Sequence, residues 1–147
     1  MLLQAGHSGD IKQLAETGRT AADAAAAIGC SVAEIAKSII FRAASGRPVL
    51  VVASGPNRVD ETKIAAALGE PIGKADADFV RQSTGYAIGG VAPIGHAVPP
   101  AVFIDLDLLG FATVWAAAGH SHAVFPVAPD LLCRLTSGAV IEVSAKR

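Results

Sequence analysis

The apolar positions of the chain follow two alternating patterns, which together predict an α/β protein. One pattern is a short apolar run rich in β-branched residues, which is typical of a strand. Residues 49–53 are apolar at every position, so we expect this run to form a central strand that is buried on both faces. The β-type runs cover residues 38–42, 49–53, 71–74, 102–105, 112–117, 122–127 and 139–143.

The other pattern is an apolar stripe at helical spacing that follows a capping residue. Ser31 and Glu34 form a capping box that opens a short helix. Asp60, and then either Asp76 or Asp78, are placed to cap two more helices. The predicted helices cover residues 11–16, 20–28, 31–37, 60–68, 76–84 and 129–135, with a helical turn around residues 108–109.

In chain order the predicted elements run ααββαβα, then a loop, then βββαβ. Hairpins are mixed with helical crossovers in this order, so we expect a mixed sheet. The sequence therefore predicts an α/β fold: a single compact domain over residues 1–147, with a curled, barrel-like sheet and helices packed around it. The length of 147 residues suits one domain with a sizeable core.

The loop in this order is the segment Thr84–His96, which holds four glycines and one proline in thirteen residues. Glycine allows positive φ and a close approach of a ligand to the backbone, and Pro93 fixes its own φ. Amide N–H groups left free in such a loop can bind an anion or the developing oxyanion of an acyl transfer. A plain glycine-rich turn between two elements is the alternative.

Composition and charge narrow the class of protein. Apolar residues make up 52% and aromatic residues 5%, so the core is built from Ala, Val, Ile and Leu. The net charge of −1 gives no indication of a general nucleic-acid or membrane binder. If a polyanion is the ligand, the contacts would come from basic residues before Gln82: Lys37, Arg42, Arg47, Arg58, Lys63, Lys74 and Arg81.

Cysteine usage and hydropathy predict a cytoplasmic protein. Cys30 and Cys133 lie among apolar neighbours and are interpreted as small core residues rather than as a disulfide framework or as nucleophiles. The first residues lack the basic and apolar regions of a signal peptide. The longest uncharged run, residues 108–129, is broken by glycine, histidine and proline, so no membrane contact is expected.

Lys37 is the charge with the most apolar surroundings, at the junction of a predicted helix and strand. A lysine in apolar company is costly unless its ammonium reaches water or an anion. It is either a surface lysine at a helix end, favoured by the helix dipole, or a functional group. The residues alone leave both interpretations open.

The histidines raise the question of a metal. His120 and His122 would share one face of a strand, and His96 and Asp105 could join them, so a His/Asp metal-dependent hydrolase is one alternative. The His-x-His pattern has no further zinc motif beside it, and we expect no metal. The chain also lacks a Gly-x-Ser-x-Gly elbow and a phosphate-loop motif. An enzyme of this sequence is therefore expected to use backbone donors, positioning and a water molecule, without a cofactor.

Three parts of the chain form a recognisable set. They are TAADAAAAIG with EIAKSIIF (residues 20–29 and 34–41), TGYAIGGVAPIG (residues 84–95), and VFID with AG (residues 102–105 and 118–119). Together they resemble the YbaK/prolyl-tRNA-synthetase-associated editing domain family. The resemblance covers nearly the whole chain, from about residue 19 to residue 143. The lysine before the Ser-Ile-Ile-Phe strand and the Gly-Gly-Val-Ala-Pro loop are its most specific features.

The resemblance implies hydrolysis of the ester of mischarged aminoacyl-tRNA, mainly tRNA(Pro) carrying a small wrong amino acid such as Ala, Ser, Cys or 2-aminobutyrate. It implies a single α/β domain with a barrel-like mixed sheet. Its catalytic residues would be Lys37, near the 3′-terminal adenosine, and Gly90, within a backbone segment 89–93 that cradles the acyl group. The implied substrate-binding residues are Thr20, Ser38, Gly89, Val91, Ala92, Pro93, Gly95, His96, Asp105, Gly119 and His120.

In this family the substrate's own ribose hydroxyl is thought to orient the attacking water, which agrees with the missing side-chain nucleophile. Prolyl-tRNA synthetase is a candidate partner, because the near-neutral charge suggests weak binding of tRNA by this chain alone. A free-standing editing factor is expected. A non-catalytic module that binds tRNA or a synthetase is the alternative from another class.

The chain departs from its relatives at one place. Where many of them carry basic residues after the late Ala-Gly, this chain has Gly119-His120-Ser121-His122. The two histidines change the pocket or its tRNA side, so the resemblance does not carry specificity for cysteine to this protein.

Overall fold

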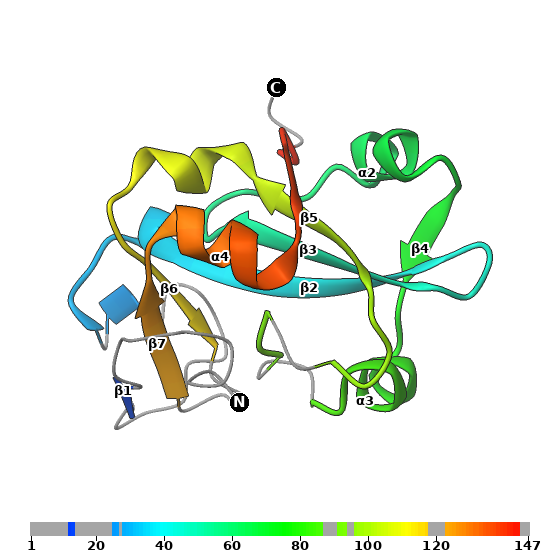
Figure 1. The fold of residues 1–147 in the computed structure, drawn as a ribbon, viewed down its shortest axis with the longest axis horizontal. Coiled ribbons are helices and arrows are strands. Elements are labelled where there is room, and N and C mark those ends of the chain that lie inside the picture. Colours follow the sequence, from blue (N-terminus) through cyan, green and yellow to red (C-terminus); the bar gives the residue numbers. More distant parts are fainter. Residues whose placement is uncertain are drawn as a thin grey trace.

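The computed structural model describes residues 12–13, 25–26, 28–86, 91–93, 96–117 and 123–144. Figure 1 shows a single compact body in which helices surround a twisted sheet. The elements are, in chain order, β1 (Lys12–Gln13), η1 (Val32–Glu34), β2 (Ile35–Ala43), β3 (Pro48–Ser54), α2 (Glu61–Leu68), β4 (Ile72–Lys74), α3 (Ala77–Thr84), β5 (Ala101–Asp105), η2 (Leu106–Gly110), β6 (Val114–Ala117), β7 (Ala123–Val127), α4 (Pro129–Thr136) and β8 (Ala139–Ile141).

The strands form one mixed sheet in the order β1-β7-β6-β2-β3-β5-β8, with β4 paired to β2. The pairs β2–β3, β2–β4, β6–β7 and β1–β7 are antiparallel, and β2–β6, β3–β5 and β5–β8 are parallel. Among the described residues no pairing joins β1 to β8, so this sheet is open. The predicted α/β fold with a mixed, curled sheet is confirmed.

The centre of the sheet is β3, the strand expected to be central. All seven of its residues are buried, and it pairs with β2 on one side and with β5 on the other. The β2–β3 hairpin turns at Gly46, whose φ of 89° is a left-handed conformation that favours glycine. The loop around Ser45 and Gly46 was therefore predicted correctly.

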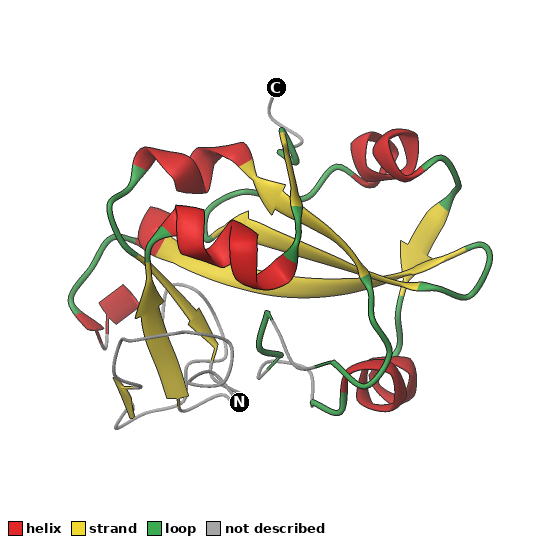
Figure 2. Cartoon of the chain, viewed as in Figure 1, coloured by secondary structure: helices red, strands yellow, loops and turns green. Residues whose placement is uncertain are grey.

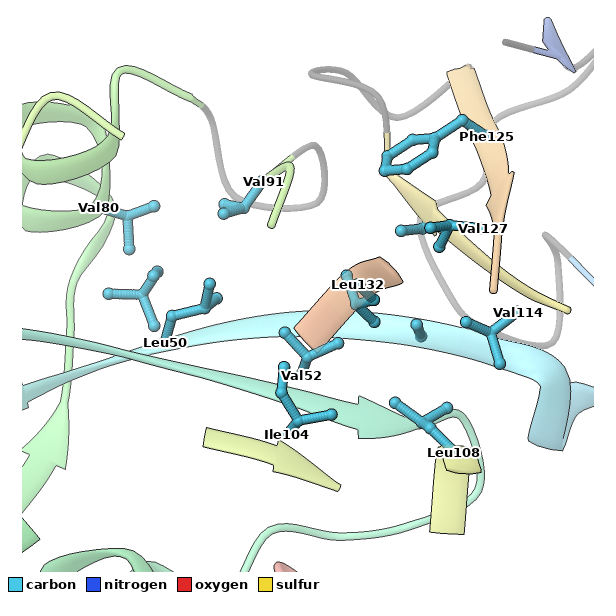
Figure 3. Close-up of a cluster of buried hydrophobic side chains, with 13 residues drawn as sticks. Leu50, Val52, Val80, Val91, Ile104, Leu108, Val114, Phe125, Val127 and Leu132 are labelled. Atoms are coloured by element: carbon cyan, nitrogen blue, oxygen red, sulfur yellow. The ribbon is translucent and has the colours of Figure 1, made fainter. Parts of the chain in front are cut away.

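The side chains of the central strands divide into two apolar clusters, one on each face. The first cluster contains Leu50 and Val52 of β3 and is covered by Val80 of α3, Val91 and Leu132 of α4. Figure 3 shows Val80 and Val91 on the side of β2 and β3 to which Leu50 and Val52 point.

The second cluster lies on the other face, where Val49, Val51 and Ala53 of β3 pack with Ile64 of α2. The alternation of side chains along a strand produces this division. Figure 1 accordingly shows α2 and α3 on opposite sides of the β2–β3 hairpin, and Figure 2 shows the helices outside the strands.

Helix boundaries follow the predicted capping residues. Asp60 accepts from the backbone N–H of Thr62 at the start of α2, and Asp76, rather than Asp78, caps α3 by accepting from the N–H of Phe79. Pro129 occupies the first turn of α4, where its missing N–H is not needed.

Two predicted helices are wrong in part. Lys12 and Gln13, within the helix expected at 11–16, form a short strand that pairs with β7. The capping box at Ser31 does form, since Glu34 Oε1 accepts from the Ser31 N–H at 3.0 Å, but it opens only the 3₁₀ turn η1. Ile35 already belongs to β2 because sheet pairing with β3 and β6 outweighs the local helical signal.

The cysteines pack as expected for small apolar residues. Cys30 contacts the small cluster of Ala25 and Ile35, and Cys133 of α4 packs against the first cluster. Burial raises the pKa of the Cys133 thiol, with a smaller contribution from Asp130.

In the part of the chain that the structure describes, none of the helices is long and apolar enough to cross a membrane.

Gly138, between α4 and β8, tests the packing of the central sheet. A Cβ atom there would lie 2.7 Å from Ile104 Cγ1 and 2.9 Å from Val102 Cγ1, both on β5. We expect Gly138→Ala to lower the free energy of unfolding by about 1–3 kcal/mol, because the added methyl overpacks a filled site. Urea unfolding measures the change. Gly110→Ala is the control, since nothing lies within 4 Å of its Cβ position; equal stability of the two variants would contradict the prediction.

Candidate functional site

A buried carboxylate organises the carboxyl ends of β3 and β5, which lie side by side because the strands are parallel. Asp105 ends β5 and is only 1% exposed. Its Oδ2 accepts from the backbone N–H of Ser54 at 2.9 Å and from Asn57 Nδ2 at 2.8 Å. Its Oδ1 accepts from the backbone N–H of Asp107 at 3.0 Å. A buried charge needs such partners, and here they join the turn after β3 to the start of η2.

Lys37 reaches the same turn from β2. Its Nζ donates to the carbonyl oxygen of Gly55 at 3.0 Å, and its side chain is half-buried. Burial lowers the pKa of Lys37 from its ordinary value, and the negative charge of Asp105 partly opposes this. Among the described residues Gly55 is its one hydrogen-bond acceptor. An ammonium group has three N–H donors, so within the described part of the chain two of them have no acceptor.

The glycine-rich segment leaves α3 and returns beside it. Thr84 Oγ1 accepts from the N–H of Tyr86 at 2.9 Å, which fixes the exit from the helix. On the return, the N–H of Ala97 donates to Thr84 O at 3.3 Å and the N–H of Val98 donates to Ser83 O at 2.8 Å. These backbone bonds bring the two ends of the segment together, as in a compact surface loop.

His96 holds the second half of this loop. Its Nε2 lies 2.7 Å from Ala92 O, and because a carbonyl oxygen only accepts, Nε2 carries the proton. The ring meets that of Tyr86 edge to face, with centroids 5.7 Å apart. Burial lowers the pKa of His96, although its bond to Ala92 acts in the opposite direction. The lowered pKa favours the uncharged ring at neutral pH, and within the described part of the chain the buried Nδ1 has no hydrogen-bond partner.

The predicted substrate residues Val91, Ala92 and Pro93 are buried beside the central sheet. Ser38 lies on the face of β2 that they cover, because it alternates with Ala36 and Ile40 of the first cluster. Its Oγ is buried, and no hydrogen-bond partner for it lies among the residues that the structure describes.

A cleft of about 380 Å³ opens between the end of this loop and the C-terminal end of α4. Its volume lies in the range of small-molecule sites. Its walls are mostly apolar, with a few polar groups from His96 and α4. The lining residues are Pro93, His96, Pro99, Pro100, Val102, Leu135, Thr136 and Ser137.

The described site residues fall into two groups, and the backbone of residues 89 and 90, which would join them, lies outside the described residues. Lys37 pairs across the hairpin with Ala53, which belongs to the second cluster, whereas Val91 belongs to the first. Lys37 and Asp105 are brought together, as are Val91, Pro93 and His96, but these two groups approach opposite faces of the central strands. A direct contact between Lys37 and the backbone of residues 89–93 stays a prediction.

Several predicted site residues lie outside the described residues: Thr20, Gly89, Gly90, Gly95, Gly119 and His120, together with His122 of the metal hypothesis. Within the ranges that the structure covers, no three His, Cys, Asp or Glu side chains are grouped so as to hold a metal ion. His96 and Asp105, the two described members of the hypothetical metal set, are bound to Ala92 and to the turn after β3.

Sequence reasoning missed the groups that hold Lys37 in place. The sequence patterns gave no role to Gly55 or Asn57, yet one supplies the acceptor for the ammonium and the other binds Asp105. The end of α4 was also missed as a wall of the cleft. The one feature of the sequence that could have indicated this network is an asparagine in the turn after a fully buried strand. Such a side chain can bind groups at the end of the neighbouring strand.

Comparison with known proteins gives the context for this geometry. A family model described as "Aminoacyl-tRNA editing domain" matches residues 15–135. The chain is 32% identical over 131 residues to the uncharacterized protein YwhH of Bacillus subtilis (strain 168), covering 89% of this chain and 83% of that protein. It is 24% identical over 128 residues to the "Putative Cys-tRNA(Pro)/Cys-tRNA(Cys) deacylase EbsC" of Enterococcus faecalis, covering 86% of this chain and 78% of that protein.

A solved structure is similar over almost the same length. It is described as the crystal structure of "a putative trans-editing enzyme for prolyl tRNA synthetase". The TM-score is 0.92 at 39% sequence identity, and the match covers 97% of this chain and 91% of the other. The fold of the described residues is thus that of a solved relative.

The lowered pKa of His96 gives a prediction for stability. In the unfolded chain His96 has its ordinary pKa of 6.5, so on acidification it is protonated there before it is protonated in the folded chain. The free energy of unfolding is therefore highest above pH 6.5 and falls as the pH drops toward the lower pKa of the folded state. In His96→Gln the amide still donates to Ala92 O but does not titrate. We expect the free energy of unfolding to fall more in the wild type than in His96→Gln between pH 7.5 and pH 5.5, measured by urea unfolding. Parallel pH profiles would contradict this.

Proposed function

Because the chain belongs to the aminoacyl-tRNA editing domain family, we propose that it hydrolyses mischarged aminoacyl-tRNA, and specifically tRNA(Pro) that carries a small wrong amino acid. Ala, Ser, Cys and 2-aminobutyrate are the candidate acyl groups. Water adds to the ester carbonyl, the ribose oxygen leaves with a proton, and the products are the free amino acid and the uncharged tRNA. Backbone donors and positioning suit this reaction, because an aminoacyl ester is already activated.

The observation that carries the proposal is the Lys37 ammonium. It is half-buried, and among the described residues one carbonyl oxygen accepts from it, while its two other N–H donors have no described acceptor. The low local dielectric strengthens the electrostatic interactions of a cation in such a position, so it can stabilise a phosphate oxygen or a developing oxyanion. We assign Lys37 to the catalytic machinery on this basis, with Gly90 as the proposed backbone donor.

The cleft beside His96 supports selection by size. Proline rings and the side chains of Val102 and Leu135 form walls that are rigid and apolar. One methylene changes binding by only about 1–3 kcal/mol, so a synthetase cannot reject every smaller amino acid by affinity alone. A separate site that admits only small acyl groups removes the products that escape this selection. We propose that Val91, Ala92, Pro93 and His96 belong to this substrate-binding side.

Prolyl-tRNA synthetase is the proposed partner. A similar solved protein is described as "a putative trans-editing enzyme for prolyl tRNA synthetase". The net charge of this chain is −1, and binding of nucleic acid by a protein alone depends mainly on cationic contacts with phosphates. Delivery of mischarged tRNA by the synthetase would compensate for a weak electrostatic attraction.

The proposed activity is tested with tRNA(Pro) charged separately with Ala, Ser, Cys, 2-aminobutyrate and Pro. We expect the protein to release at least one of the four wrong amino acids and to leave Pro-tRNA(Pro) intact. Lys37→Ala should lower kcat/KM by about 10²-fold, the typical cost of losing one donor to an oxyanion. Lys74→Ala is the control: Lys74 is exposed on β4, so any contact that it makes with tRNA would change KM, whereas kcat should stay at the wild-type value.

The outcomes separate the alternatives. Full activity in Lys37→Ala would remove the lysine from the mechanism. Loss of activity in EDTA would support the His/Asp metal-dependent hydrolase instead. No release of any amino acid, combined with retained binding of tRNA, would indicate a non-catalytic binding module.

A further inference from the structure

The buried carboxylate at the end of β5 has a role that the proposed reaction does not yet explain. We propose that Asp105 and Asn57 are positioning residues for Lys37: they fix the turn whose Gly55 carbonyl holds the lysine ammonium. This inference depends on the proposed function only for its effect on catalysis, since its geometric content concerns the protein alone. It replaces the prediction that Asp105 binds substrate directly.

The Asp105 carboxylate is buried and already holds three donors, which favours a structural role over direct contact with a substrate. Both of its oxygens accept hydrogen bonds, from Ser54 and Asn57 at Oδ2 and from Asp107 at Oδ1, and the residue is 1% exposed. A buried carboxylate is strongly unfavourable without such donors, so the network is required for the charge to exist there. The carboxylate thus ties the turn after β3 to the end of β5.

Asn57 completes the network from within the turn. Its Nδ2 donates one hydrogen to Asp105 Oδ2 at 2.8 Å and the other to Asp107 Oδ2 at 2.7 Å. Both donors of the amide are therefore used, and the amide separates two carboxylates that would otherwise repel each other. Any other residue at position 57 would have to provide two donors in the same directions.

Lys37 responds to this network by two routes. The first is mechanical: Gly55, its acceptor, lies in the turn between the two residues that bind Asp105, Ser54 and Asn57. The second is electrostatic, because Asp105 is the charged group that favours the protonated lysine. Among the described residues the one ion pair within 4 Å is Lys63–Glu142, so Asp105 acts on Lys37 through the turn and its field rather than by direct contact.

Among the described residues, two carboxylates lie near the turn that binds Lys37. Asp105 comes from β5, and Asp107 from η2 is one step further away, on the other side of the Asn57 amide. Of these two, Asp105 is the one whose charge favours the protonated lysine. Replacing that carboxylate by a neutral amide is a clean way to change the electrostatics of Lys37.

The first readout of the test is the reactivity of the Lys37 amine, and the second is catalysis. Full-length wild type, Asp105→Asn, Asn57→Ala and the control Glu142→Gln are treated with trace acetic anhydride over a range of pH, and the acetylation of Lys37 is followed by mass spectrometry of its peptide. Glu142→Gln makes the same carboxylate-to-amide change beside Lys63, outside the network. Folding of each variant is checked by thermal unfolding.

In Asp105→Asn we expect the midpoint of Lys37 acetylation to move to lower pH, because a neutral amide no longer favours the protonated amine. In Asn57→Ala we expect faster acetylation of Lys37 at each pH, since the turn no longer holds the Gly55 carbonyl in place. Glu142→Gln should match the wild type. An unchanged acetylation profile of Lys37 in folded Asp105→Asn would overturn the inference. If Asp105→Asn does not fold, Asn57→Ala decides by the same criterion.

Deacylation of mischarged tRNA(Pro) is the second readout. Asp105→Asn and Asn57→Ala should lower kcat by about 10- to 100-fold with little change in KM, which is the effect expected for a misplaced catalytic group. Glu142→Gln should keep full activity. If acetylation responds as expected but even the wild type hydrolyses no ester, the positioning role holds and the proposed function fails. If the wild type is active but acetylation of Lys37 is unchanged in the variants, the proposed function holds and the positioning role fails.

Discussion

The complete burial of β3 is the constraint on which the rest of the structure depends. Every residue of this strand is shielded, so both of its faces must be covered and both of its edges must be paired. The apolar side chains of β3 provide the main driving force, at roughly 25 cal/mol for each Å² removed from water. Parallel pairing with β5 then places two carboxyl ends together, which is the arrangement that allows Asp105 to bind the turn after β3.

This constraint also separates the polar groups of the protein. Along β2 the side chains alternate, so Ser38 lies on the face covered by the glycine-rich segment and Lys37 on the other. The resemblance implies one site that contains Lys37 and the glycine-rich segment, and this stays a prediction. In the described part of the structure an ammonium is bound at the end of β3 on one face, and a small cleft beside His96 is enclosed on the other.

The fold was predictable where a local signal agreed with the tertiary structure. The uninterrupted apolar run of β3, the caps Asp60 and Asp76, and Gly46 in the hairpin each determine a short element without help from distant residues. The prediction was wrong where pairing across the sheet decided the outcome, as at Lys12 and at Ile35. The site was harder to predict, because Asn57 and Asp105 are 48 positions apart and only the parallel pairing brings them together.

The two ends of the glycine-rich segment are hydrogen-bonded to each other, and this affects which sequence changes the segment can accept. Backbone bonds from Ala97 and Val98 to the end of α3 hold the two ends of the segment whatever lies between them. Residues in the interval can be exchanged, or their number altered, at a modest entropic cost and without displacing the sheet. Under the proposed function, substitutions in this interval would change the preference for an acyl group while the lysine side of the molecule keeps its architecture.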